Sequence, residues 1–170
     1  MGRLVTLALV VILGLVACGP AQPEATRRDA VTNSPTPHVG SVDPVLDRVA
    51  RQVSSIVTNV LTLVGEAKQN PPLIDVGQVL QGAQYAHGSL DIIKKDGANA
   101  FTHSGGGGRQ MLKAVDGLEN SMSALVVYLG NPSPATRAGY TTQWTTGQTE
   151  WNNAVRSVYA GARGTKPLIG

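Results

Sequence analysis

Cysteine, histidine and phenylalanine are scarce in this chain of 170 residues, which has one Cys, three His and one Phe. A single cysteine excludes an intramolecular disulfide and any metal site built from several thiolates. Charged residues make up 15% of the chain, below the roughly 25% usual in soluble domains. The net charge is +3. Because the basic residues are scattered rather than clustered, we expect no nucleic-acid-binding surface.

The length and the apolar content bound the domain organisation. A chain of this length suits one domain of ordinary size, and it leaves no room for an enzyme with a separate cofactor module. The hydrophobic fraction of 42% is too high for a chain that is disordered throughout. We therefore expect one folded domain, and no cofactor is predicted.

The longest apolar run of the sequence lies at its beginning. Met1-Gly2-Arg3 supplies one positive charge, and residues 4–17 are almost wholly apolar. The run is shorter than the roughly 20 residues that a transmembrane helix needs, and it has the form of the apolar region of a secretory signal peptide. It ends at Leu15-Val16-Ala17-Cys18. These features predict a signal peptide over residues 1–17.

The sequence Leu15-Val16-Ala17-Cys18 resembles the lipobox of bacterial lipoprotein precursors, and Leu15, Ala17 and Cys18 match its three constrained positions. The resemblance covers residues 1–19. It implies that a lipoprotein signal peptidase cuts before Cys18 and that Cys18 carries a diacylglyceryl thioether. Two acyl chains are enough for stable membrane attachment. The resemblance thus places the protein at the extracytoplasmic face of the cell membrane, in the cell envelope.

The segment that follows is predicted to be a flexible tether. Residues 18–40 are rich in Pro, Thr, Ala and Ser and show no apolar periodicity, which is typical of linkers. The folded domain is expected over residues 41–163, with residues 164–170 as a tail.

Four segments of the domain show helical spacing of apolar residues. The first begins at Ser41 or Asp43, with Pro44 suited to the first helical position, and the second begins at Asp75, with Gln78 at capping-box spacing. The apolar stripe of the first is Val45, Val49, Val53, Ile56, Val60 and Leu63 or Val64, and that of the second is Val76, Val79, Ala83, Ala86, Leu90 and Ile93.

The third and fourth segments follow a glycine run. Gly105–Gly108 are expected to form a flexible linker because glycine opposes helix formation. Gly130 is expected to end the third helix, and Ser133 to cap the fourth. The third stripe is Met111, Val115, Leu118, Met122, Leu125 and Leu129, and the fourth is Tyr140, Trp144, Trp151, Val155, Val158 and Ala162. Glycines and threonines weaken the first half of the fourth segment, where a short extended stretch is an alternative. Together the segments predict an all-α fold, a small up-down-up-down bundle of about four helices.

No set of residues predicts catalysis or metal binding. His87 and Asp91 are one helical turn apart, and we interpret them as an i,i+4 hydrogen bond on a helix surface, because the remaining histidines, His38 and His103, lie elsewhere in the chain. The carboxylate pairs Asp91 with Asp96 and Asp116 with Glu119 fit solvated helix faces. No nucleophile, base and orienting group occur together, so we expect a protein that is not an enzyme.

Tyr140, Trp144 and Trp151 are the most informative candidates for a binding surface. They share one predicted helix face, and both tryptophans of the chain are among them. Buried, they would form the bulky part of the core; exposed, they would form a surface for a partner or an apolar ligand. The core interpretation is favoured because the stripe continues in phase into Val155 and Val158.

The sequence therefore predicts a membrane-anchored cell-envelope lipoprotein whose helical domain binds or scaffolds an unknown protein or apolar ligand. One alternative is a lipoprotein of the kind by which prophages exclude competing phages, which the chain resembles in lipobox, tether and compact domain. A second alternative is a carrier of lipid or another apolar ligand, and it predicts a cavity of about 300–1,000 Å³ between the helices. An envelope hydrolase would instead require clustered polar side chains in a cleft.

Overall fold

The computed structural model describes residues 42–170, and the described domain is entirely helical. Its helices are α1 (Pro44–Ala67), α2 (Val76–Asp96), the short α3 (Ala98–His103), α4 (Gly105–Gly130) and α5 (Pro134–Val158). The prediction of an all-α bundle is confirmed. The predicted signal peptide, the lipobox with Cys18 and the tether lie outside the described residues.

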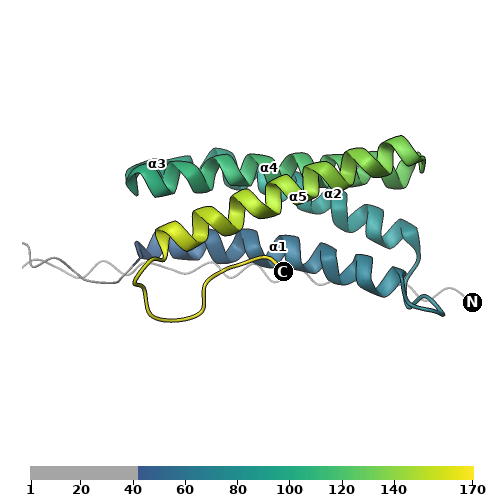
Figure 1. Ribbon diagram of the computed structural model, residues 1–170, viewed down its shortest axis with the longest axis horizontal. Helices are drawn as coiled ribbons and strands as arrows, with labels where there is room; N and C mark the ends of the chain where they lie inside the picture. The colour runs from purple at the N-terminus through teal and green to yellow at the C-terminus, as the bar shows by residue number, and fades with distance from the viewer. Residues whose placement is uncertain (1–41) are drawn as a thin grey trace, which may run out of the picture. The chain divides into compact units, whose positions relative to one another are not determined.

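The four long helices alternate in direction (Figure 1). Helices α4 and α5 form an extensive antiparallel pair, α2 packs against α4, and α1 packs against α2. In the described domain the backbones of α1 and α5 do not come close to one another. Direct contact between α1 and α5 therefore does not close this side of the bundle.

The helix starts predicted from the sequence are confirmed. The Asp43 carboxylate accepts hydrogen bonds from the backbone N–H groups of Val45 and Leu46, at 2.8 and 3.0 Å, and Pro44 begins α1. Asp75 forms a complete capping box with Gln78 at the start of α2. Ser133 caps α5, also in a capping box. In each case a side-chain oxygen satisfies a backbone N–H that has no partner within the helix.

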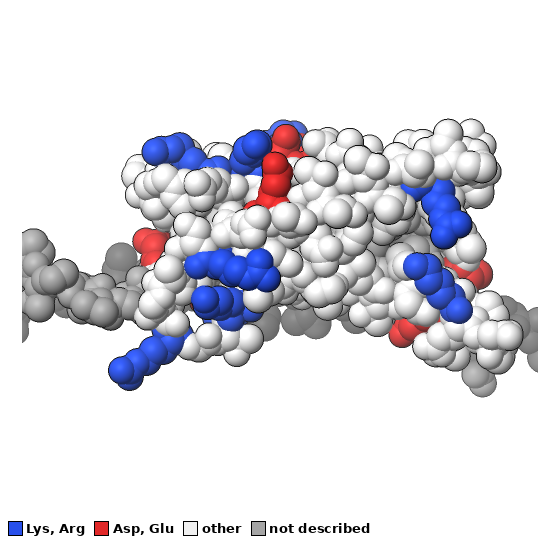
Figure 2. Space-filling model, viewed as in Figure 1, with Lys and Arg blue, Asp and Glu red and all other residues white. Residues whose placement is uncertain are grey.

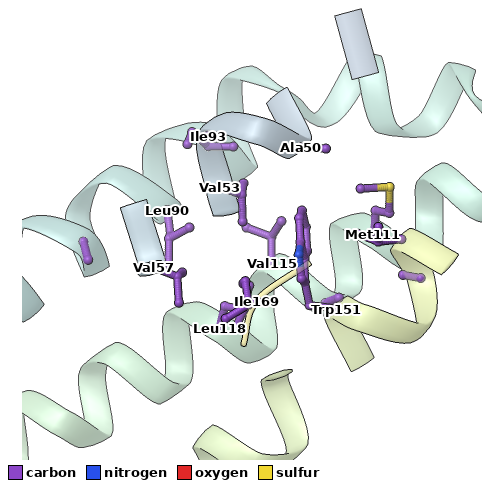
Figure 3. Packing of buried hydrophobic residues seen from close by; sticks show 14 of the residues in the cluster. Ala50, Val53, Val57, Leu90, Ile93, Met111, Val115, Leu118, Trp151 and Ile169 are labelled. Atoms are coloured by element: carbon purple, nitrogen blue, oxygen red, sulfur yellow. The ribbon is translucent and has the colours of Figure 1, made fainter. Parts of the chain in front are cut away.

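The core is built from the stripes of α2 and α4 almost as the sequence predicts. Figure 3 shows residues of α1, α2, α4 and α5 pointing toward one another across the bundle. The buried members are Val79, Ala83, Ala86, Leu90 and Ile93 of α2 and Met111, Val115, Leu118, Met122 and Leu125 of α4.

Part of the apolar stripe predicted for α1 is wrong, because some of its residues do not lie on the buried face of the helix. Val45 is 52% exposed, and the buried residues of this helix are Leu46, Ala50, Val53, Val57 and Val60. Valines and isoleucines occur on neighbouring faces of α1, so two overlapping stripes fit its sequence. The buried one has the regular 4,3,4,3 spacing of a bundle seam.

The prediction that Gly105–Gly108 form a flexible linker is wrong, because these residues are the first turn of α4. A Cβ atom at Gly108 would overlap the carbonyl oxygen of Phe101, and one at Gly107 would lie 2.7 Å from a methyl carbon of Val158. The missing side chains let α3 and the end of α5 pack directly on this turn. Close tertiary packing thus outweighs the helix-propensity cost of glycine, about 1 kcal/mol per residue.

Helices α4 and α5 also approach closely at their middle, where Gly117 faces Gly147. A Cβ atom at Gly147 would lie 2.7 Å from the carbonyl oxygen of Gly117. Next to this contact, the buried Ser121 hydroxyl lies 2.7 and 2.8 Å from the carbonyl oxygens of Gly117 and Gln143, and it donates to either. This packing keeps α5 helical through its glycine- and threonine-rich first half, so the extended alternative does not occur.

The 164–170 segment, predicted only as a tail, completes the core between α1 and α5. Ile169 is 1% exposed. Its backbone N–H donates to the Asn152 side chain of α5 and its carbonyl accepts from the same amide group, at 2.9 and 2.8 Å. Ser54 and Arg51 of α1 donate to the carbonyl oxygens of Leu168 and Thr165, at 3.1 and 3.0 Å. The segment therefore bridges the two helices that do not meet.

Candidate functional site

The three aromatic residues of α5 occupy different environments. Trp151 is fully buried, and its indole Nε1 donates to the Pro167 carbonyl oxygen at 2.8 Å. The core interpretation is confirmed for Trp151, and the surface alternative is wrong for it. Trp144 and Tyr140 are half-buried and pack against the core. Only these two remain accessible to a ligand.

The polar residues singled out from the sequence form ion pairs along the α2–α4 surface. His87 does not bond to Asp91, so that prediction is wrong: His87 lies 3.6 Å from Glu119 of α4, and Asp91 accepts from Lys95 at 2.6 Å. Lys94 donates to Asp116 at 2.9 Å and to Glu119 at 2.5 Å.

These ion pairs account for the shifted pKa values on this surface. Hydrogen bonds to Asp116 and Glu119 hold the pKa of Lys94 above its usual range. The hydrogen bond from Lys95 lowers the pKa of Asp91. Each shift favours the charged form of a side chain that already has an opposite charge beside it, as in structural ion pairs. Within residues 42–170 no three His, Cys, Asp or Glu side chains gather in a way that could hold a metal ion.

A partly enclosed cleft lies at one end of the bundle. It lies where α1 and α4 end and α2 and α5 begin, and its volume is about 420 Å³. We call it the end cleft. Its apolar lining comes from all four long helices: Val64, Val76, Val79, Leu125, Leu129 and Tyr140. Each of these residues belongs to a stripe predicted from the sequence. The sequence does not predict the cleft itself, because the apolar stripes of neighbouring helices are expected to pack against one another along their whole length.

Two tyrosines form one wall of the end cleft. The rings of Tyr128 and Tyr140 are stacked, with centroids 6.3 Å apart and planes inclined by 2°. Burial raises the pKa of Tyr140, so its hydroxyl stays neutral at physiological pH. Tyr128 was missed by the sequence analysis because it lies between two members of the α4 stripe, Leu125 and Leu129. Its pairing with Tyr140 becomes visible only when α4 and α5 are placed side by side.

Two basic residues, Lys68 and Arg137, complete the lining of the end cleft. Figure 2 shows a notch at this end of the domain with basic side chains on both sides of it. Neither Lys68 nor Arg137 forms an ion pair with a carboxylate of the described domain. No acidic residue lines the cleft. The end cleft thus combines apolar side chains from all four long helices with two basic side chains that have no carboxylate partner in the described domain.

A second, more open hollow adjoins the end cleft. Its volume is about 640 Å³, and it shares Tyr128, Arg137 and Thr141 with the cleft. The rest of its lining comes from the turn between α4 and α5 and from the polar face of α5. It is more open to solvent and takes no residue from α1 or α2, so the end cleft is the better candidate for binding.

The fold and the cleft together define an all-helical domain with a candidate binding site at one end. No helix in residues 42–170 has the length and apolar character needed to cross a bilayer. In comparisons with known proteins, no family model, curated sequence or solved structure matches the chain.

Proposed function

We propose that this chain is a cell-envelope lipoprotein, held in the membrane by a diacylglyceryl group on Cys18 and presenting a non-catalytic binding domain. The observation that carries the proposal is the lipobox match of Leu15, Ala17 and Cys18, where the single cysteine of the chain ends its longest apolar run. The spacing places the reactive thiol directly after the signal peptide. This is the position at which a cysteine becomes the first residue of a mature lipoprotein.

The polar surface of the domain supports a binding role rather than a catalytic one. Catalytic groups are usually found in a cleft, with pKa values moved toward the working pH. Here Asp91, Lys94 and Glu119 pair with oppositely charged neighbours on the α2–α4 surface, and the end cleft is lined by apolar, aromatic and basic residues. That combination suits recognition of a ligand.

Metabolic labelling tests the anchor directly. Cells producing the protein are grown with an alkyne-bearing fatty acid, and the label on the protein is measured in the membrane fraction. The wild-type chain is expected to be labelled and Cys18→Ala to be unlabelled. Val16→Ala is the matched control, because it changes the unconstrained position of the lipobox and should leave labelling intact. Label retained by Cys18→Ala, or absent from the wild-type chain, would contradict the proposal.

The end cleft specifically favours a second candidate function, that of a carrier for lipid or another apolar ligand. Its volume of about 420 Å³ lies within the usual range of ligand sites, about 300–1,000 Å³. A carrier should retain cargo when it is isolated from its own membrane. We expect co-purifying lipid from the wild-type protein and much less from Thr141→Trp, whose indole would fill the cleft from α5. Equal amounts from both proteins would count against a carrier.

A further inference from the structure

We propose that the end cleft binds an anionic amphiphile, with the apolar chain along the cleft floor and the anionic group between Lys68 and Arg137. This inference rests on the carrier function proposed above and specifies its ligand. The shared chemistry is one acyl chain joined to a carboxylate or a phosphate, which occurs both in free fatty acids and in anionic phospholipids.

The apolar part of the ligand is indicated by seam residues that are only partly covered by other helices at this end. Leu129 and Val64 are only partly buried, although they continue the stripes that close the rest of the bundle. Val76, which also lines the cleft, is 55% exposed. Covering apolar side chains releases water from them and is favourable in proportion to the covered area. An acyl chain provides that cover without a change in the fold.

The charge of the ligand is indicated by the residues that line the end cleft. Lys68 and Arg137 are in the lining, and no acidic residue is. Like several other basic residues of the described domain, these two form no ion pair with a carboxylate. A guanidinium and an ammonium that face one ligand favour a carboxylate or phosphate, to which both donate charge-assisted hydrogen bonds.

The acidic residues at this end lie outside the lining of the end cleft. Two helices begin there and two end there, so the partial charges of the helix termini largely offset one another. The acidic residues nearest in sequence, Glu66 and Asp75, do not line the cleft, and the Asp75 carboxylate is bonded to the backbone of Gln78. Lys68 and Arg137 therefore supply the positive charge in the lining of the end cleft.

Photolabelling of the full-length, membrane-anchored protein tests the inference. Four probes carry the same diazirine-bearing acyl chain: a fatty acid, a phosphatidylglycerol, the corresponding fatty alcohol and a quaternary ammonium amphiphile. Cross-linked residues are mapped by mass spectrometry. We expect labelling between Leu125 and Thr141 by at least one of the two anionic probes, about tenfold above the alcohol and the cation. The stronger of the two anionic probes identifies the source of the ligand.

Variants separate this inference from the carrier function. Lys68→Gln with Arg137→Gln should reduce anionic labelling of the cleft to the level of the alcohol. Arg48→Gln with Arg109→Gln removes two charges from the opposite end of the bundle and should change nothing. Equal labelling of the cleft by alcohol and anion would overturn the anionic ligand and leave the carrier function standing. Absence of cleft labelling by every probe would overturn both.

Discussion

The indole Nε1 of Trp151 donates a 2.8 Å hydrogen bond to the backbone carbonyl oxygen of Pro167. This bond ties the largest buried side chain of α5 to a segment without regular secondary structure. It also satisfies the one polar atom of a side chain that is otherwise surrounded by apolar residues. Because the same segment also accepts hydrogen bonds from α1, it closes the core on the side between α1 and α5.

Truncation of Ile169 should therefore destabilise the domain as strongly as truncation of a core helix residue. Ile169→Ala removes a side chain that is 1% exposed, and we expect a loss of about 2–5 kcal/mol in the free energy of unfolding. The neighbouring Leu168 is 38% exposed, so Leu168→Ala should cost less than about 1 kcal/mol. Urea denaturation followed by tryptophan fluorescence measures both. Equal, small effects would mean that the segment is not part of the folded core.

Substitution of Gly147 tests the close contact between α4 and α5. A Cβ atom at this position would meet the Gly117 carbonyl oxygen at 2.7 Å and the Ser121 hydroxyl at 2.9 Å. Gly147→Ala should force the two helices apart, at a cost of about 1–3 kcal/mol. Gly139→Ala on the same helix meets nothing within 4 Å and should be stabilising by up to about 1 kcal/mol through helix propensity. We expect the two variants to shift the melting temperature in opposite directions, with Gly147→Ala lowering it and Gly139→Ala raising it. A higher melting temperature for both variants would contradict the contact.

A second glycine pair tests whether the glycine run is packed helix or loose linker. Gly108→Ala should be destabilising, because its Cβ would overlap the Phe101 carbonyl oxygen, whereas Gly106→Ala has open space around it. We expect a loss of about 1–3 kcal/mol for the first and a gain of up to about 1 kcal/mol for the second. A flexible linker would tolerate both changes equally in the same denaturation experiment.

The pair formed by Tyr159 and Asp47 predicts a loss of stability in alkaline solution. Burial and the 2.8 Å hydrogen bond to Asp47 raise the pKa of Tyr159 above its usual value of about 10. Since the folded state holds this proton more tightly than the unfolded state, the stabilisation is complete below about pH 10 and is lost as the pH rises above it.

Tyr159→Phe provides the test of that pH dependence. The variant should cost about 1 kcal/mol at pH 7, and its stability should fall less than that of the wild type between pH 9 and pH 11. Some alkaline loss should remain, because burial also raises the pKa of Tyr140. The measurement is the free energy of unfolding at several pH values. Parallel curves for the two proteins would show that Tyr159 ionises normally in the fold.

Much of the bundle could be predicted from the sequence because its signals are local. The Asp75–Gln78 capping box, the Ser133 cap and the regular stripes of α2 and α4 each depend on residues a few positions apart. The register predicted for α1 is wrong in part because valines lie on several faces of that helix. The packing of Gly108 under α3 could not be predicted, since it depends on Phe101 folding back onto the glycine turn.

The candidate site was only partly predictable for the same reason. The sequence favours the core for Tyr140 and Trp151 alike, and the structure buries Trp151 fully but leaves Tyr140 half-buried in the lining of the end cleft. The end cleft lies where two helices end and two begin, and a stripe of apolar residues carries no information about the distance to the next helix. Lys68 and Arg137 are separated by 69 positions in the sequence, so only the fold brings both of them into the lining of the end cleft.

The intact mass and amino-terminal sequence of the protein purified from its native membrane test the central claim most directly. The account predicts a chain that begins at Cys18 and carries a diacylglyceryl group on the Cys18 sulfur. A chain that begins at Met1, or one with an unmodified thiol at Cys18, would contradict it.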